Sequence, residues 1–196
     1  MSASVPEGIL HRAVRHLPNF ICLIRLALIW PILVTLHAGE YRTSLALFVA
    51  AAASDGLDGY LAKRFGWTSE LGKLLDPIAD KLLLMSVFVE CAWLGLVPWW
   101  LTAAVVARDL LIGSGAIAFR LFIGPVHGRP TMLSKINTGA QLIYVALVML
   151  YAVVRLPPRE MLEACALLTL ATTVASGLQY VVTFTRRAWA LPARST

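Results

Sequence analysis

Charge is scarce in this chain. Only 14% of its 196 residues are Asp, Glu, Lys or Arg, whereas 59% are hydrophobic. A soluble domain of this length does not need so much apolar surface, because a single core buries a limited number of side chains. Apolar runs of about 20 residues recur, each long enough to cross ~30 Å of hydrocarbon. The composition therefore argues against an ordinary soluble protein and predicts an integral membrane protein.

Cysteine is also rare, and the positions of the three cysteines do not indicate a metal-binding site. Cys22, Cys91 and Cys165 are far apart, with no CxxC or Cys/His spacing. This pattern predicts buried, reduced thiols and argues against a zinc site.

The net charge of +6 indicates lipid rather than nucleic acid as the partner. Its basic residues lie at the ends of apolar runs, where they meet anionic headgroups. Eleven lysines and arginines fall on the side of segment 54–81 and of both chain ends, against Arg42, Arg155 and Arg159 on the other. This bias predicts that the segment faces the cytoplasm. We expect a bacterial inner membrane.

Breaks that carry Gly, Pro or charge divide the chain into six expected helices. Their ranges are 19–38, 43–65, 73–95, 98–121, 133–155 and 160–184. We expect an all-α fold, a single domain over 1–196 that forms one bundle of six transmembrane helices. Residues 1–17 predict an amphipathic segment on the membrane surface, and residues 185–196 a basic tail.

Aspartate is the rarest charged residue after lysine, yet it is concentrated. Four of the five aspartates lie within 54–81. Asp55 and Asp58 are three residues apart, and Asp76 and Asp80 four apart, so each pair shares one face of a helix. An unpaired aspartate at mid-membrane depth costs ~2.5–3.5 kcal/mol, so such a cluster needs counter-charge.

Divalent cations would supply that charge. Oxygen ligands without His or Cys favour Mg²⁺ or Mn²⁺, and four carboxylates suit two such ions, which together clamp a transferring phosphoryl group. Gly56, Gly59 and Gly72 would each weaken a helix by up to ~1 kcal/mol, which fits a phosphorylated ligand close to the backbone. The alternative is that the carboxylates cap helices and pair with lysines on a solvated loop.

The same segment resembles the signature of the CDP-alcohol phosphotransferases, D-x2-D-G-x2-A-R-x8-G-x3-D-x3-D. The matching positions are Asp55, Asp58, Gly59, Ala62, Lys63, Gly72, Asp76 and Asp80. Lys63 stands where the family has arginine. The stretch LPNFICLIR is similar to the family's first helix through Asn19 and Arg25, with Cys22 in place of a hydroxyl residue.

Further stretches resemble particular branches of the family. LLDPIADK is similar to the glycerol-lipid members, the phosphatidylglycerophosphate and cardiolipin synthases. Pro130 to Leu142 resembles the eukaryotic-type cardiolipin synthases. The resemblance implies a transferase in which an acceptor hydroxyl attacks the β-phosphorus of CDP-diacylglycerol and CMP leaves. It also implies a homodimer.

The resemblance assigns roles to the aspartate segment. Two divalent cations, Mg²⁺ or Mn²⁺, would be held by Asp55, Asp58, Asp76 and Asp80, and Asp80 would bridge them or act as the base. The nucleotide would contact Asp58, Gly59, Ala62, Lys63 and Gly72.

The acceptor pocket is expected elsewhere. Arg108 and Asp109 are charged residues within the otherwise apolar fourth expected helix, 98–121. One interpretation is a salt bridge between them. The other is that Arg108, Lys135 and Arg120 bind the acceptor's phosphate. Phosphatidylglycerol and glycerol 3-phosphate both carry a phosphate, so that pocket does not choose between them. The Lys135 segment favours phosphatidylglycerol, hence a cardiolipin synthase; a phosphatidylglycerophosphate synthase stays open. A cation or proton transporter is the alternative of another class, although its carboxylates would be distributed along a path.

Overall fold

The structure is a computed structural model that describes residues 17–65, 70–122 and 131–189. Within these ranges, side chains are described except at 17–21, 55–65, 70–77, 116, 118–122 and 186–189. The predicted amphipathic segment lies almost wholly outside the described residues, as does the end of the tail from residue 190.

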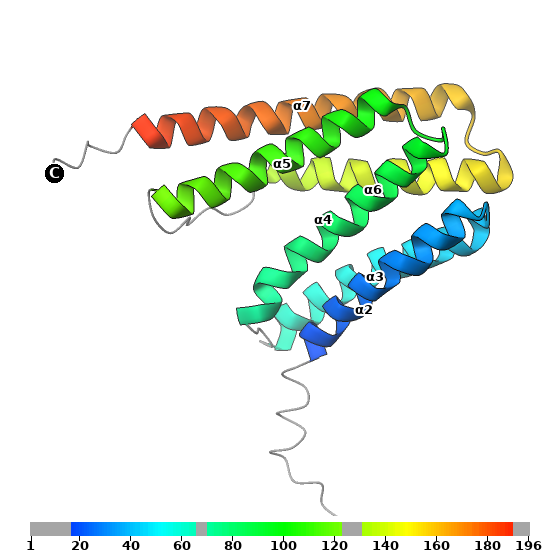
Figure 1. The fold of residues 1–196 in the computed structure, drawn as a ribbon, viewed down its shortest axis with the longest axis horizontal. Coiled ribbons are helices and arrows are strands. Elements are labelled where there is room, and N and C mark those ends of the chain that lie inside the picture. The colour runs from blue at the N-terminus through cyan, green and yellow to red at the C-terminus, as the bar shows by residue number, and fades with distance from the viewer. Residues whose placement is uncertain (1–16, 66–69, 123–130, 190–196) are drawn as a thin grey trace, which may run out of the picture. The chain divides into compact units, whose positions relative to one another are not determined.

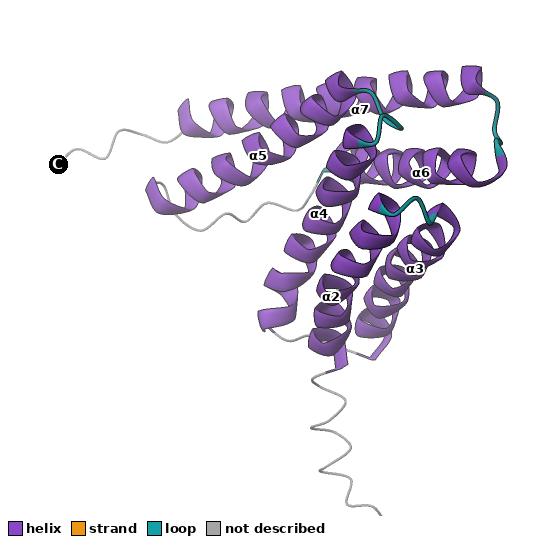
Figure 2. Cartoon of the chain, turned by 45° about the vertical axis from the view of Figure 1, so that its right-hand side comes forward, coloured by secondary structure: helices purple, strands orange, loops and turns teal. Residues whose placement is uncertain are grey.

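The described part of the chain is helical, with no strand in it (Figure 2), which confirms the all-α class. The helices are α2 (Leu17–His37), α3 (Tyr41–Phe65), α4 (Glu70–Trp93), α5 (Trp99–Phe122), α6 (Met132–Val154) and α7 (Arg159–Trp189). Each corresponds to one of the six expected helices.

Glycine and proline set the helix ends where the sequence predicted breaks. Gly39 and Gly95 follow α2 and α4 with φ of 78° and 73°, a conformation that other residues rarely adopt. Thr131 caps α6 by accepting a hydrogen bond from the Ser134 backbone N–H. The last helix runs five residues beyond its expected end at 184, to Trp189, because neither Gly nor Pro occurs between residue 184 and Pro192.

The chain divides into two compact units, Met1–Leu94 and Gly95–Thr196. In the first unit, α2 packs against both α3 and α4 (Figure 1). Its core contains Ile32, Leu36 and Phe88, all fully buried. The buried Ser44 hydroxyl of α3 donates to the Ile32 carbonyl of α2 at 3.1 Å. The central position of α2 places its polar residues within reach of the other two helices.

In the second unit, α7 packs against both α5 and α6 (Figure 1). Leu101 and Val105 of α5, and Val145 and Met149 of α6, are fully buried. On α6 these apolar residues lie toward the C-terminal end, and the buried Asn137 and Gln141 lie toward the N-terminal end.

The distribution of polarity in the second unit is the reverse of that in a soluble protein. Ile117, Leu167 and Leu168 are about 60% exposed, at 63%, 61% and 60%, whereas Asn137 and Gln141 are fully buried. By length and composition, Met132–Val154 and Arg159–Thr185 could each span a membrane, and Cys22–His37 is a shorter apolar helix. Exposed leucines around buried amides are expected where lipid is the solvent. These features support a membrane protein.

Candidate functional site

The four clustered aspartates lie on two successive helices, as the sequence predicted. Asp55 and Asp58 lie near the end of α3, and Asp76 and Asp80 lie in the first half of α4. Each pair therefore shares one face of its helix. The side chains of Asp55, Asp58 and Asp76 are outside the described residues, as are those of Gly59, Ala62, Lys63 and Gly72, so their proposed ligand contacts stay predictions.

Asp80 has a described side chain and a defined partner. Its carboxylate accepts a hydrogen bond from the Arg25 guanidinium of α2, which makes an ion pair across 55 residues of sequence. The Arg25 side chain is 1% exposed and that of Asp80 is 37% exposed. The buried arginine therefore fixes a carboxylate that is still partly open to its surroundings.

The donor chemistry of this segment fits hard divalent cations. All four candidate ligands are carboxylates, which Mg²⁺ and Mn²⁺ prefer. One pair lies on α3 and the other on α4, and both helices pack against α2. Where side chains are described, no group of three or more His, Cys, Asp or Glu residues could hold a metal ion. The predicted metal set has one member in that part of the chain, Asp80.

Arg108 is the centre of a buried polar cluster in the second unit. Its Nη1 donates to Asp109 Oδ1 at 2.5 Å, and its Nη2 donates to the hydroxyls of Ser134 at 2.8 Å and Ser176 at 2.6 Å. The side chains of Arg108 and Asp109 are 3% and 2% exposed. The salt bridge considered for this pair is thus present, and it coexists with contacts from α5 to α6 and α7.

The cluster continues along α6 and α7. Asn137 Oδ1 accepts hydrogen bonds from the hydroxyls of Thr172 at 3.0 Å and Thr173 at 2.8 Å. Gln141 Nε2 donates to the Thr173 hydroxyl at 3.4 Å. The result is a polar stripe, formed by Arg108, Ser134, Asn137, Gln141, Thr172, Thr173 and Ser176.

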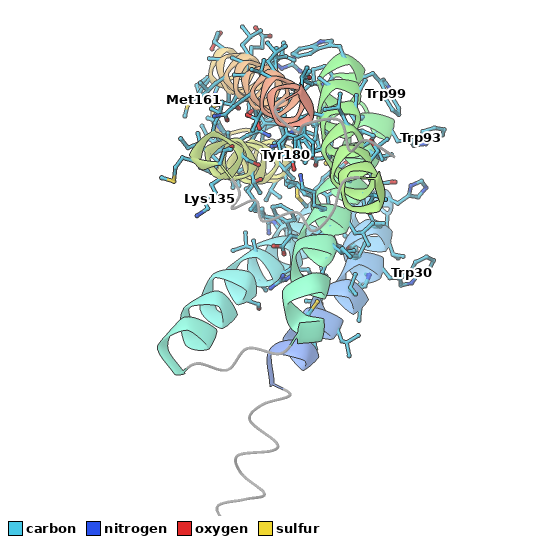
Figure 3. All side chains as sticks on the ribbon, turned by 90° about the vertical axis from the view of Figure 1, so that its left-hand side faces the viewer. Trp30, Trp93, Trp99, Lys135, Met161 and Tyr180 are labelled. Carbon is cyan, nitrogen blue, oxygen red and sulfur yellow. The ribbon has the colours of Figure 1, made fainter. Side chains whose placement is uncertain are left out.

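Lys135, the other basic residue expected in the acceptor pocket, is exposed and points outward from α6 (Figure 3). It follows Ser134, so its side chain leaves the helix on a different face from the stripe. The Arg120 side chain is outside the described residues.

Sequence reasoning did not identify the α7 half of the stripe. The signal was present, because Ser134, Asn137 and Gln141 recur at helical spacing in α6 while Thr169, Thr173 and Ser176 do so in α7. In helices that are otherwise apolar, polar residues on one face usually mark an interhelical contact or a functional site.

Comparison with known proteins places this chain in a family. The sequence profile of the CDP-alcohol phosphatidyltransferases matches residues 15–184. The chain is 32% identical over 182 residues to a probable cardiolipin synthase (CMP-forming) of Drosophila melanogaster, covering 85% of this chain and 56% of that protein.

Bacterial relatives are similar to the same extent. The chain is 30% identical over 179 residues to a probable phosphatidylglycerophosphate synthase of Mycobacterium tuberculosis (strain CDC 1551 / Oshkosh), covering 86% of this chain and 81% of that protein. It is 32% identical over 152 residues to a CDP-diacylglycerol–glycerol-3-phosphate 3-phosphatidyltransferase of Bacillus subtilis (strain 168), covering 69% and 77% of the two chains. The match confirms the family inferred from the aspartate signature. This chain belongs to the CDP-alcohol phosphatidyltransferase family.

Proposed function

We propose that this chain transfers the phosphatidyl group of CDP-diacylglycerol to phosphatidylglycerol, which makes cardiolipin and releases CMP. The observation that carries the proposal is the family match over residues 15–184, a range that includes the complete aspartate signature and spans both compact units. Both units would therefore belong to one catalytic domain.

In the proposed reaction, the acceptor's hydroxyl oxygen forms a bond to the β-phosphorus of CDP-diacylglycerol. The bond between that phosphorus and the oxygen bridging to CMP breaks, and CMP leaves with the electron pair. Asp80 takes the proton of the attacking hydroxyl, because its carboxylate is partly exposed while Arg25 holds it in place. Asp58, Gly59, Ala62, Lys63 and Gly72 bind the nucleotide.

Asp55, Asp58, Asp76 and Asp80 would hold two divalent cations, on which this family generally depends. When bound, such ions neutralise the pyrophosphate and the charge that develops on the leaving group. Either Mg²⁺ or Mn²⁺ suits the all-oxygen donor set.

Arg108, Lys135 and Arg120 stay the proposed phosphate-binding set, although Lys135 leaves α6 on a different face from the stripe that contains Arg108. Arg108 remains suited to this role although Asp109 and two serines contact it, because its Nε has no hydrogen-bond partner among the described residues. A buried donor of this kind is costly unless a ligand uses it.

Phosphatidylglycerophosphate synthesis from glycerol 3-phosphate is the second candidate. The mycobacterial relative favours it, since this chain covers 81% of that protein against 56% of the fly protein. The Lys135 segment, similar to that of eukaryotic-type cardiolipin synthases, favours phosphatidylglycerol as the acceptor.

The protein is proposed to cross a bacterial inner membrane with six helices and to form a homodimer. Both chain ends and the aspartate segment would then face the cytoplasm. The excess of lysine and arginine on one side supports this topology.

The deciding experiment follows CMP release from CDP-diacylglycerol by purified protein with Mg²⁺ or Mn²⁺. Phosphatidylglycerol, glycerol 3-phosphate and inositol phosphate are supplied separately. Release with phosphatidylglycerol alone is the expected result, and release with glycerol 3-phosphate alone would establish the second candidate. Asp76→Asn should abolish release, whereas Glu90→Gln, an acidic control on the same helix, should preserve it. No release with any acceptor by folded protein would refute the proposed function.

A further inference from the structure

Two fully buried amides in the second unit each have one atom without a hydrogen-bond partner. Asn137 and Gln141 are 0% exposed. Among the described residues, neither Asn137 Nδ2 nor Gln141 Oε1 has a partner. An unsatisfied buried polar atom costs roughly 1–3 kcal/mol, and apolar residues at both positions would avoid that cost. Their presence therefore indicates a partner that the protein chain itself does not provide.

The two atoms are chemically complementary to a hydroxyl group. The amide Nδ2 of Asn137 is a donor and the carbonyl Oε1 of Gln141 is an acceptor, and a hydroxyl both accepts and donates. Residues four apart on a helix have Cβ atoms about 5–6 Å apart, so one hydroxyl with two hydrogen bonds of about 2.8 Å can bridge them.

Neighbouring contacts hold both amides in this arrangement. The hydroxyls of Thr172 and Thr173 donate to Asn137 Oδ1, which leaves Nδ2 as the unused group of this amide. The Thr173 hydroxyl also accepts a hydrogen bond from Gln141 Nε2, which leaves the Gln141 carbonyl as the remaining acceptor. These contacts hold the other atom of each amide, Asn137 Oδ1 and Gln141 Nε2, against α7.

The position of the pair relates it to the arginine proposed to bind phosphate. Ser134, which accepts from Arg108, precedes Asn137 by three residues on α6. That separation is about 5 Å along the helix axis, comparable with the span from the phosphorus to the secondary hydroxyl of a glycerol phosphate. One headgroup could therefore contact Arg108 through its phosphate and the amides through its hydroxyl.

We propose that Asn137 and Gln141 recognise the secondary, non-reacting hydroxyl of the acceptor's glycerol group. This inference rests on the proposed function, and it applies to phosphatidylglycerol and glycerol 3-phosphate alike. It assigns the pair to acceptor specificity, because an acceptor without that hydroxyl would leave both amide atoms unsatisfied.

The test compares each acceptor with an analogue that lacks only the secondary hydroxyl. The pairs are glycerol 3-phosphate with 1,3-propanediol monophosphate, and phosphatidylglycerol with phosphatidyl-1,3-propanediol. The reacting primary hydroxyl is present in all four. Wild-type protein should prefer the glycerol compound by roughly tenfold in kcat/KM, the effect of about one buried hydrogen bond. Asn137→Ala and Gln141→Met should remove the preference while the KM for CDP-diacylglycerol stays unchanged.

Thr138→Val is the matched control, since the Thr138 hydroxyl donates to the Ser134 carbonyl of its own helix at 3.1 Å. This variant should retain the preference. The stability of Gln141→Met without acceptor should equal or exceed that of the wild type, because an unsatisfied atom is removed and the volume is conserved. Equal use by the wild type of a glycerol acceptor and of its analogue without the secondary hydroxyl would overturn the inference. A preference that survives both amide substitutions, or a fall in stability alone, would also overturn it.

A binding measurement separates failure of this inference from failure of the proposed function. Glycerol 3-phosphate should raise the Tm of the wild type and of Thr138→Val more than 1,3-propanediol monophosphate does. In Asn137→Ala and Gln141→Met the two compounds should act equally. This holds even if no acceptor supports CMP release; an equal Tm shift in the wild type would refute the hydroxyl site by itself.

Discussion

Two arginine–aspartate ion pairs, one in each unit, occur among the described residues, and they differ in where the carboxylate lies. Arg25 and Asp80 join α2 to α4, and their side chains are 1% and 37% exposed. Arg108 and Asp109 are adjacent on α5 and are 3% and 2% exposed. In the first pair only the arginine is buried, whereas in the second both charges are.

The difference separates two uses of a buried arginine. In the first unit, the buried arginine holds a carboxylate whose side chain is itself partly exposed. In the second, Asp109 is enclosed and acts as a counter-charge, while the guanidinium extends to hydroxyls on two other helices. The comparison supports chemistry at Asp80 and a structural role for Asp109.

Of the changes to these ion pairs, replacing the Asp80 carboxylate should have the largest effect on the rate of CMP release. Asp80→Asn should lower kcat for CMP release by about 10²–10⁴-fold, the usual contribution of a positioned general base. Asp109→Asn is the matched change in the enclosed pair. It should lower the free energy of unfolding, while the protein that remains folded should keep most of its kcat. The comparison would fail if Asp80→Asn were nearly as active as the wild type.

Breaking the enclosed pair should have the largest effect on stability. Arg108→Ala leaves the Asp109 charge buried without its counter-charge, which should reduce the free energy of unfolding by about 3–5 kcal/mol. Unfolding in detergent mixtures would measure the change. The double variant Arg108→Ala/Asp109→Ala should be more stable than Arg108→Ala, since neither charge is then buried; additive losses would contradict the assignment.

Breaking the open pair should destabilise less. Arg25→Ala should cost about 1–3 kcal/mol, the penalty for one lost charge-assisted hydrogen bond, because Asp80 can still reach its surroundings. Arg25→Lys keeps the charge and should recover part of both stability and CMP release. A loss as large as that of Arg108→Ala would show that exposure of the carboxylate does not distinguish the pairs.

A third pair gives the smallest expected effect. His37 Nδ1 lies 2.8 Å from Glu90 Oε1, with side chains 68% and 21% exposed. Exposed pairs contribute little, so His37→Ala should change the free energy of unfolding by no more than about 0.5 kcal/mol. The same unfolding assay would measure it, and a loss above 1 kcal/mol would break the trend of effect with burial.

The helices and the aspartate signature could be predicted from the sequence because both are local patterns. Apolar runs bounded by Gly39, Gly95 and the Pro-rich break at 156–158 gave the helix positions, and the spacing of Asp55, Asp58, Asp76 and Asp80 gave the family. The extension of α7 to Trp189 was missed because no local signal marks an end there.

The contacts between helices could not be predicted, since they depend on how the helices pack. The sequence places Arg25 in a family motif, but it does not show that the arginine reaches Asp80, 55 residues away. The helical spacing of Ser134 in α6 and of Thr173 and Ser176 in α7 marks polar faces, but it does not show that these faces meet around Arg108.

The sequence by itself therefore determined the helical class, the membrane-like composition and the carboxylate signature, since periodicity and residue type act within a few turns of one chain. Only the tertiary structure decided which of two arginine–aspartate pairs is enclosed, and that two buried amides each retain an unsatisfied atom. The physical reason is that burial and hydrogen-bond satisfaction are properties of neighbouring helices together, and no single segment specifies them.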